Sequence, residues 1–344
     1  MNSELRQDIV SGDWIVISPK RAKKHLQNLG QEKRIKAPIK DCPFENPQKN
    51  GNGEPILIYP PAADSQRSKW EVMVVQNKYP VLSHLPALVR KAKQAGKNVC
   101  AKKIKKGPYL TIEGIGYHDL VISRNHYKNF AHLDKKTANL VFHAFRDRYL
   151  MLIKDRCLAY ISIFHNWGSK AGATIYHPHY QMMALPVVPP DVEHSLSGSI
   201  NYFKKFKKCV HCEMIEYERK EKKRIIYENQ GAVVFTPFVS REPFELRVFP
   251  KKHLPYFEDI PDEDLKWVVE ALQQALIKIE KRLKDPDYNF FIHTAPILEK
   301  NKYKNYHWHI EIQPKISISA GFELGTGIEI TVVDPDEAAK ILKA

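Results

Sequence analysis

The sequence predicts an α+β protein made of two similar halves. Short runs rich in β-branched and aromatic residues are interspersed with longer segments of helical periodicity. The same series of motifs also occurs twice in the same order, which indicates an internal duplication. We therefore expect two tandem halves, each with an antiparallel sheet and helices packed on one face. Their expected bounds are residues 1–190 and 191–344, joined by a Pro-, Ser- and Gly-rich stretch near residues 187–199.

The strand-like segments are short, and several alternate apolar and polar residues, as half-buried strands do. They are residues 70–75, 118–123, 159–164, 231–236, 245–250, 289–294 and 307–312. Two longer segments, residues 135–155 and 261–285, have the periodicity of helices. The second of these begins at Pro261 and has acidic residues in its first turn, and both features are typical of a helix start.

The duplication is visible in the order of the motifs. The first half has Cys42 and Glu45 three residues apart, then two strands, a long helix, a strand and the segment HPHYQ. The second half has Cys209 and Cys212, also three residues apart, and the same succession of elements, which ends in HWHIEI. Each half therefore combines a candidate metal-binding pair with an H-x-H strand.

Composition narrows the class of protein. No run of about 18 apolar residues is present, so we expect no membrane span. The polar, acid-containing N-terminus lacks the pattern of a secretory signal, so we expect a cytoplasmic protein. The formal charge of +15 suits a polyanion or a phosphorylated metabolite, but the scattered lysines fit a solvated surface equally well. The five cysteines, an odd number, argue against a disulfide framework.

The segment HPHYQ carries groups that suit chemistry at phosphorus. Residues two apart on a strand point to the same face, so His177, His179 and Gln181 share a face if the strand is regular. A neutral imidazole can attack phosphorus and form a covalent phospho-histidine. A carboxamide can donate to a phosphoryl oxygen as negative charge develops there. The alternative interpretation of the H-x-H pattern is a pair of ordinary polar or metal-binding histidines.

Two sets of residues have the composition of zinc sites, since zinc prefers four ligands from cysteine, histidine and carboxylate. The second-half set is Cys209, Cys212, His253 and His307. The matching first-half set has a carboxylate in place of one thiolate and consists of Cys42, Glu45, His126 and His177. Because the carboxylate is the weaker ligand for zinc, we expect the first site to bind zinc less tightly or to be empty.

Residues 165–189, HNWGSKAGATIYHPHYQMMALPVVP, resemble the active-site segment of the galactose-1-phosphate uridylyltransferase family, a branch of the histidine-triad superfamily. The segments GYHDLVISRNHYKNFAHL, CVHCEMIEYE, PFELRVFPKKH and AGFELGTGIEI also have counterparts in that family, so the resemblance covers nearly the whole chain. It implies two histidine-triad-like halves, usually in a homodimer whose active sites take residues from both subunits.

The resemblance also implies roles for single residues. His179 matches the nucleophile that accepts a nucleoside monophosphate, His177 matches a zinc ligand, and Gln181 matches the residue that contacts the phosphate of the intermediate. The implied reaction is the ping-pong transfer of UMP between UDP-glucose and a hexose 1-phosphate such as galactose 1-phosphate. The residues that match substrate-binding positions are Arg21, Asn77, Asn166, Thr174, Phe322 and Glu323.

Three alternatives remain open. Some family members bind a metal through a glutamate and three histidines, for which this chain offers Glu193, His293, His307 and His309. We prefer the Cys₂His₂ set, because Cys209 and Cys212 would otherwise lack a purpose. The segment MMALPVVPP also resembles the branch that phosphorolyses ADP-glucose, with AMP carried on the histidine. The third alternative, a nucleotide- or RNA-binding protein without turnover, is supported by the positive charge and opposed by the complete HPHYQ motif.

Overall fold

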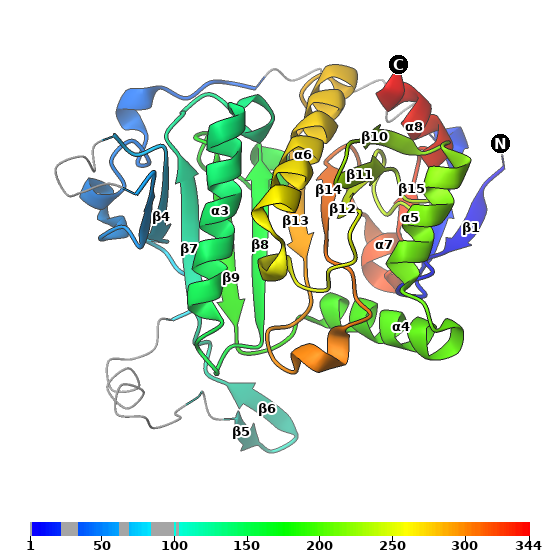
Figure 1. Cartoon of the computed structure of the whole chain (residues 1–344), viewed down its shortest axis with the longest axis horizontal. Helices are drawn as coiled ribbons and strands as arrows, with labels where there is room; N and C mark the ends of the chain where they lie inside the picture. The colour runs from blue at the N-terminus through cyan, green and yellow to red at the C-terminus, as the bar shows by residue number, and fades with distance from the viewer. Residues whose placement is uncertain (1, 22–33, 62–68, 84–99, 101–102) are drawn as a thin grey trace.

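The computed structural model describes residues 2–21, 34–61, 69–83, 100 and 103–344. Its centre is one antiparallel sheet of ten strands, and two long helices cover one face of this sheet (Figure 1). The first half of the chain contributes, from the outer edge inward, β3 (Leu57–Tyr59), β4 (Val72–Gln76), β7 (Tyr117–Ser123), β9 (His179–Leu185) and β8 (Tyr160–Trp167). The second half continues outward with β13 (Tyr288–His293), β14 (His309–Pro314), β12 (Leu246–Pro250), β11 (Ala232–Phe235) and β10 (Ile225–Glu228).

The order of the strands is mirrored about the pair β8–β13. In each half, the innermost strand follows a long helix, and the H-x-H strand lies next to it. Tyr288 pairs with Trp167 across the junction, and Ile292 pairs with Ile163. The predicted α+β class and the two histidine-triad-like halves are confirmed. The two half-sheets join edge to edge, because pairing satisfies the backbone groups of two strands that would otherwise be exposed edges.

The helices α3 (Lys135–Leu152) and α6 (Asp262–Leu283) lie side by side on the sheet (Figure 1). Asp134 caps α3, because its side chain accepts a hydrogen bond from the backbone N–H of Thr137 at 3.0 Å. Inward residues such as Val141, Phe145 and Leu272 are fully buried against the sheet. Burial of each such side chain stabilises the fold by about 1.5–3 kcal/mol. The helices thus hold one face of the sheet and leave the other face for functional side chains.

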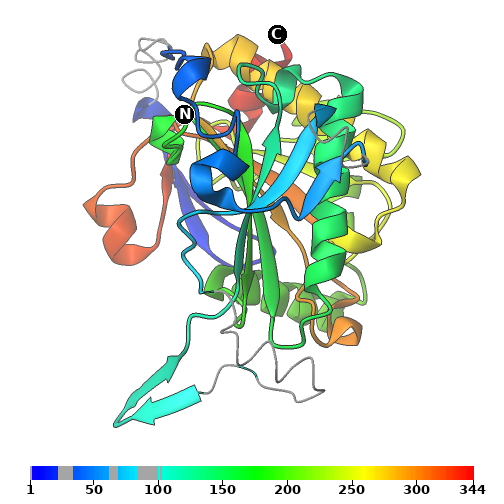
Figure 2. The same cartoon turned by 90° about the vertical axis from the view of Figure 1, so that its left-hand side faces the viewer.

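The remaining elements surround this core. β1 (Glu4–Gln7), β2 (Trp14–Ile17) and β15 (Ile330–Thr331) form a small sheet, and β5 (Lys103–Lys106) pairs with β6 (Tyr109–Ile112) in a ribbon that projects from the body (Figure 2). The other helices are α4 (Pro190–Phe206), α5 (Val210–Glu221), α7 (Gly321–Thr326) and α8 (Pro335–Lys343). Short helical turns span residues 19–21, 39–41, 48–52, 130–132, 169–171, 257–259 and 300–303.

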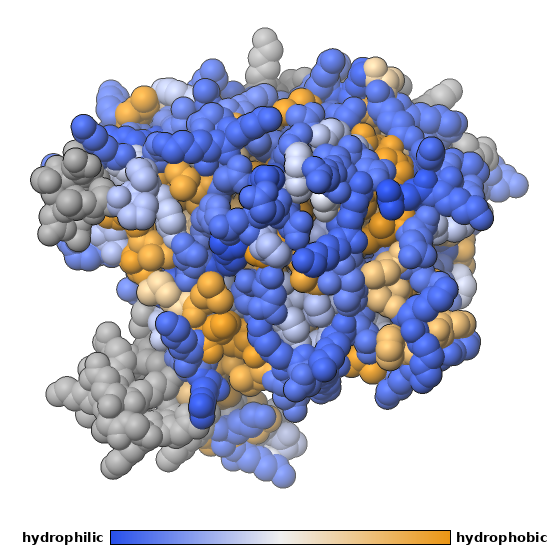
Figure 3. Space-filling view, viewed as in Figure 1, coloured by the Kyte–Doolittle hydropathy of each residue, from blue (hydrophilic) through white to orange (hydrophobic). Residues whose placement is uncertain are grey.

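The surface over α3 and α6 is largely hydrophilic, with apolar areas scattered among polar side chains (Figure 3). None of the helices within the described residues combines the length and the apolar character that crossing a bilayer requires.

The segment near residues 187–199, which we expect to link the two halves, forms the helix α4 from Pro190 onward. Proline is favoured at the first helical position, where its missing N–H has no partner to lose. Buried residues then recur at helical spacing along α4, namely Val192, Leu196 and Ser199. The boundary between residues 190 and 191 stays a prediction.

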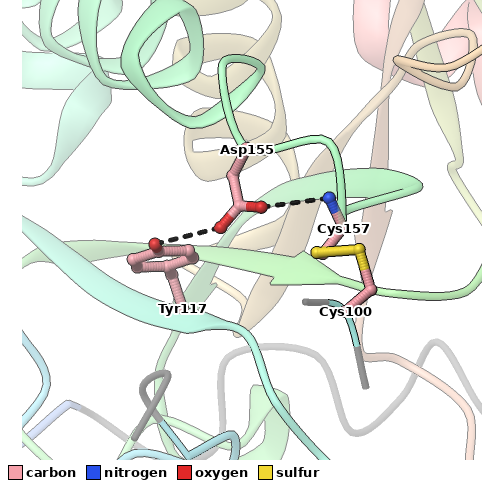
Figure 4. Close-up of a disulfide and its surroundings, with 4 residues drawn as sticks. All are labelled: Cys100, Tyr117, Asp155 and Cys157. Carbon is pink, nitrogen blue, oxygen red and sulfur yellow. Dashed lines mark hydrogen bonds between the residues drawn. A yellow bond between two sulfur atoms is a disulfide. The ribbon is translucent and has the colours of Figure 1, made fainter. Parts of the chain in front are cut away.

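The expectation that the odd cysteine count argues against disulfides is wrong for one pair. Cys100 and Cys157 form a disulfide, and their Cα atoms are 5.1 Å apart, within the usual range (Figure 4). Asp155 supports the turn at Cys157 by accepting the Cys157 backbone N–H at 3.0 Å and the Tyr117 hydroxyl at 3.2 Å. The three other cysteines, which remain thiols, all belong to the candidate metal clusters.

We predict that Gly198→Ala destabilises the protein by about 1–3 kcal/mol, the usual cost of forcing extra volume into a packed site. A Cβ at position 198 would lie 1.7 Å from the carbonyl oxygen of Val10, which is backbone and cannot move aside cheaply. Gly325→Ala is the matched control, because a Cβ there meets nothing within 4 Å. Urea unfolding measures both variants. Equal unfolding free energies for the two variants would contradict this packing argument.

Candidate active site and metal clusters

His179 is the first residue of β9 and lies on the face of the sheet away from α3. Its neighbours on the strand, Tyr180 and Met182, point into the core beneath the helices, so His179 and Gln181 share the opposite face. Pro178 precedes the strand, where its missing N–H costs no ladder hydrogen bond. The His179 side chain is only 8% exposed.

Hydrogen bonding fixes the tautomer of His179. Its Nδ1 lies 2.9 Å from the carbonyl oxygen of His177, and a carbonyl can only accept, so Nδ1 carries the hydrogen. The lone pair is therefore on Nε2. Burial lowers the pKa of His179, which favours the neutral ring. His165, whose pKa burial lowers to about 3, donates from Nδ1 to the carbonyl oxygen of His179 at 2.8 Å. The arrangement provides an uncharged imidazole with one nitrogen available as a nucleophile.

Asn166 lies beside His179 on the neighbouring strand. His165 pairs with Tyr180, so the next residue of β8 comes level with His179 on the same face. Asn289 of β13 donates from Nδ2 to the Asn166 Oδ1 and to the carbonyl oxygen of Ala171, both at 2.8 Å. With its oxygen occupied, Asn166 has its N–H groups left for a ligand. Sequence analysis missed Asn289, since only the β8–β13 pairing brings the two asparagines together.

Gln181 and Asn77 meet around a histidine that sequence analysis also missed. His118 of β7 is 4% exposed, and its Nε2 lies 2.9 Å from the Gln181 Oε1 and 3.1 Å from the Asn77 Nδ2. The structure thus brings four predicted site residues to one face, namely His179, Gln181, Asn166 and Asn77. The signal available in the sequence was the alternation along β7, which puts His118 on the same face as Leu120 and Ile122.

Four other predicted substrate-binding residues lie on loops or short helices outside the central sheet; Arg21, Thr174 and Phe322 are exposed and Glu323 is half-buried. Arg21 ends a short helical turn, and Thr174 lies in the loop before β9. Phe322 and Glu323 are on α7, where the Glu323 carboxylate accepts the Ala320 backbone N–H at 3.0 Å. Within the described part of the chain, none of the four forms a hydrogen bond or ion pair with His179 or Gln181. Their predicted roles stay untested.

The first predicted metal set is assembled in the fold. The ligand atoms of Cys42, Glu45, His126 and His177 all lie within 4.8 Å of one another. His126 donates from Nε2 to the carbonyl oxygen of Ala37 at 2.9 Å, and His177 donates from Nε2 to that of Ser123 at 2.6 Å. Both rings therefore present an Nδ1 lone pair to the cluster. Burial lowers the pKa of His177 to about 4, which keeps it in the neutral, ligating form.

This first cluster is in contact with the candidate nucleophile. Phe44, between the two ligands Cys42 and Glu45, packs edge-on against His179 with ring centroids 4.9 Å apart. The carbonyl group that fixes His179 belongs to His177, which is itself a ligand. An ion held here would consequently stabilise the position of the nucleophile.

The second predicted metal set is also assembled, as a Cys₂His₂ group of Cys209, Cys212, His253 and His307. Cys209 caps α5 and Cys212 is in its first turn. The Cys212 Sγ lies 3.3 Å from the His253 Nδ1 and 3.6 Å from the His307 Nδ1. His253 donates its other nitrogen to the carbonyl oxygen of Lys304 at 2.8 Å. A hydrogen bond from Cys212 lowers the pKa of Cys209, which favours the thiolate that zinc requires.

The alternative set of Glu193, His293, His307 and His309 does not come together. Glu193 is exposed on α4, and His307 belongs to the Cys₂His₂ group. His293 and His309 instead cluster with Glu311, which is two residues further along β14 and was not predicted. The His293 Nε2 lies 3.5 Å from a Glu311 carboxylate oxygen. The preference for the Cys₂His₂ set therefore agrees with the geometry.

A family model described as a domain of unknown function (DUF4921) matches residues 80–343. The chain belongs to this family. It is 34% identical to an ADP-glucose phosphorylase of Arabidopsis thaliana over 343 residues, covering 99% of this chain and 92% of the relative. The crystal structure of an ADP-glucose phosphorylase from Arabidopsis thaliana with bound ADP-glucose matches with a TM-score of 0.81 and 31% identity, covering 99% of this chain and 98% of that one.

The resemblance to the uridylyltransferases is also confirmed. A galactose-1-phosphate uridylyltransferase of Thermotoga maritima is 25% identical over 348 residues, covering 99% of this chain and 98% of the relative. These similarities extend over both halves of the chain. The protein is thus an enzyme of the nucleotidyltransferase superfamily that includes galactose-1-phosphate uridylyltransferase.

We predict that Cys212→Ser removes one equivalent of zinc per chain and lowers the Tm by roughly 5–10 °C, the shift that a few kcal/mol produces in a chain of this size. Elemental analysis after gel filtration and thermal unfolding measure the two effects. The matched change at the other cluster, Glu45→Cys, should instead strengthen zinc retention against a chelator, since thiolate is the softer ligand. Full zinc content and an unchanged Tm in Cys212→Ser would show that the second set is not a zinc site.

Proposed function

We propose that this protein transfers a nucleoside monophosphate from a nucleotide sugar to an acceptor phosphate through a covalent adduct on His179. The observation that carries the proposal is the fixed, neutral ring of His179, whose Nδ1 donates to the His177 carbonyl and whose Nε2 keeps its lone pair. Asn166 and Gln181 lie on the same face and supply N–H donors for a phosphate group.

The first half of the reaction breaks one bond and forms one. The Nε2 lone pair of His179 attacks the α-phosphorus of the nucleotide sugar, and the bond to the bridging oxygen breaks. The sugar 1-phosphate leaves with that bonding electron pair. In the second half, an oxygen of the acceptor phosphate attacks the same phosphorus and returns the lone pair to Nε2. Amide donors from Asn166 and Gln181 stabilise the charge on the non-bridging oxygens in both steps.

We propose an ADP-hexose as the donor, with inorganic phosphate as the acceptor. Support comes from the 34% identity to the Arabidopsis phosphorylase and from the TM-score of 0.81 against a structure with bound ADP-glucose. The second candidate is the transfer of UMP between UDP-glucose and galactose 1-phosphate, which the 25% identical relative from Thermotoga maritima supports. Both candidates use the same step on His179 and differ in the base and the acceptor.

Zinc fits both four-residue clusters by the chemistry of their donors. Bound there, it would supply structural support, with Cys42, Glu45, His126 and His177 as ligands at one cluster and Cys209, Cys212, His253 and His307 at the other. The chain itself holds and orients the reacting groups. We further propose a homodimer in which Phe322, which is exposed, and Glu323 of one subunit contact the sugar bound to the other, with Arg21 and Thr174 near the phosphates.

We predict that His179→Asn abolishes the adduct while the fold and the metal content stay intact, because asparagine lacks a nucleophilic nitrogen. Wild-type protein is incubated separately with ADP-glucose and UDP-glucose, and intact-mass spectrometry identifies an AMP or a UMP adduct. An AMP adduct supports the phosphorylase and a UMP adduct alone supports the uridylyltransferase. If neither nucleotide sugar gives an adduct and the protein binds RNA in a salt-dependent manner, a binding protein without turnover becomes the better interpretation.

A further inference from the structure

We propose that His118 is a positioning residue that turns the amide of Gln181 so that its two N–H groups face the phosphate on His179. The inference rests on the proposed function, because it assigns the direction in which Gln181 offers its donors. His118 makes no contact with the nucleophile in the part of the chain that the structure describes. Its effect would pass entirely through Gln181.

The backbone determines which nitrogen of His118 carries the hydrogen. The backbone N–H of Val81 donates to the His118 Nδ1 at 3.2 Å, so Nδ1 must be the acceptor. In a neutral imidazole with Nδ1 as acceptor, the hydrogen is on Nε2. Backbone pairing holds this contact in place, since the Asn77 N–H donates to the carbonyl oxygen of His118 at 2.9 Å. Loop and strand together therefore impose a single tautomer.

The tautomer in turn determines the orientation of Gln181. The His118 Nε2–H points to the Gln181 Oε1 at 2.9 Å, and only the oxygen of the amide can accept it. A rotated amide would place an N–H group against the Nε2–H of His118, which is 4% exposed, and the hydrogen bond between the two residues would be lost. The Gln181 amide nitrogen consequently faces away from His118 and keeps both hydrogens for a ligand.

Asn77 is oriented around the same ring. Its Oδ1 accepts the backbone N–H of Tyr79 at 3.0 Å, so the Asn77 amide nitrogen is the atom beside His118, 3.1 Å from Nε2. Because Nε2 already donates to Gln181, it cannot accept from Asn77 as well. The Asn77 amide nitrogen also lies 3.5 Å from Nδ1, the accepting nitrogen, so one of its N–H groups has a partner there and the other is left for a ligand. Two amides that the sequence assigned to the active site thus share one imidazole.

The opposite side of the nucleophile has the same kind of arrangement. There, Asn289 donates to the Asn166 Oδ1 and leaves the Asn166 nitrogen for the ligand. In both places, a donor on the neighbouring strand occupies the oxygen of a site amide. If His118 only filled space beside Gln181, it would not matter which of the two side chains donates the hydrogen bond.

Two single variants distinguish a positioning role of His118 from a role in packing alone. His118→Gln keeps a donor near the original Nε2 position, whereas His118→Asn reaches only the Nδ1 position and loses the bond to Gln181. We expect His118→Asn to slow nucleotidyl-His179 formation by about ten-fold or more, and His118→Gln to retain most of the wild-type rate. Rapid-quench mass spectrometry measures the rate in a single turnover. Equal slowing in both variants, or the same rate as wild type in His118→Asn, overturns the proposal.

A double-variant cycle tests whether the effect passes through Gln181. In a Gln181→Ala background, adding His118→Asn should cause no further slowing, whereas independent roles would multiply the two losses. Additive losses would overturn the positioning role even if each variant is slow. Thermal unfolding of all variants shows whether a slow rate reflects lost structure.

Nitrogen NMR of ¹⁵N-histidine protein tests the tautomer without any turnover. His118→Gln identifies the His118 signals by their absence, and the proposal requires Nε2 protonated and Nδ1 unprotonated. The opposite tautomer overturns the inference whatever the activity. If the tautomer is as expected but wild type forms no adduct with either nucleotide sugar, the proposed function fails, and the orientation of Gln181 stands as a feature of a different ligand site.

Discussion

One hydrogen bond, from the Nδ1–H of His179 to the carbonyl oxygen of His177, controls the chemistry available at this site. It makes Nε2 the nitrogen with a lone pair, and burial keeps the ring neutral. The carbonyl is held in turn, because the His177 side chain lies in the first metal cluster and donates to Ser123. Pro178 links the two histidines and restricts the backbone between them. A tripeptide thus joins a structural cluster to the candidate nucleophile.

The second half of the chain has a corresponding tripeptide, residues 307–309, but different residues around it. The His309 Nδ1 lies 3.1 Å from the carbonyl oxygen of His307, the same contact that fixes His179. At the strand position that matches Gln181, however, the second half has Glu311. Although burial opposes its ionisation, His293 and Arg247 lower the pKa of Glu311 to about 2, so it is a carboxylate. A carboxylate there would repel a phosphate, and Glu311 instead takes part in a buried ionic network with Arg247, 3.6 Å away.

Sequence analysis predicted the features that depend on local pattern or fixed spacing. Alternating residues located the main strands, helical periodicity located α3 and α6, and the repeated motifs revealed the duplication. Sequence analysis did not predict the features that depend on contacts between residues far apart in the sequence. The glycine inside α4 is explained only by Val10, whose carbonyl oxygen lies 1.7 Å from where a Cβ at position 198 would be, and the disulfide joins two positions 57 residues apart. His118 and Asn289 act through partners on other strands, which no local pattern reveals.

The same geometry makes the proposed reaction independent of the choice of nucleotide. The proposed step depends on groups that meet a phosphate: the imidazole of His179 and the amides of Asn166 and Gln181. Hydrogen bonds within the protein orient all three side chains. The base can therefore change without disturbing the reacting groups. Relatives named for ADP-glucose and for galactose 1-phosphate can accordingly align with this chain over 99% of its length while using different nucleotides.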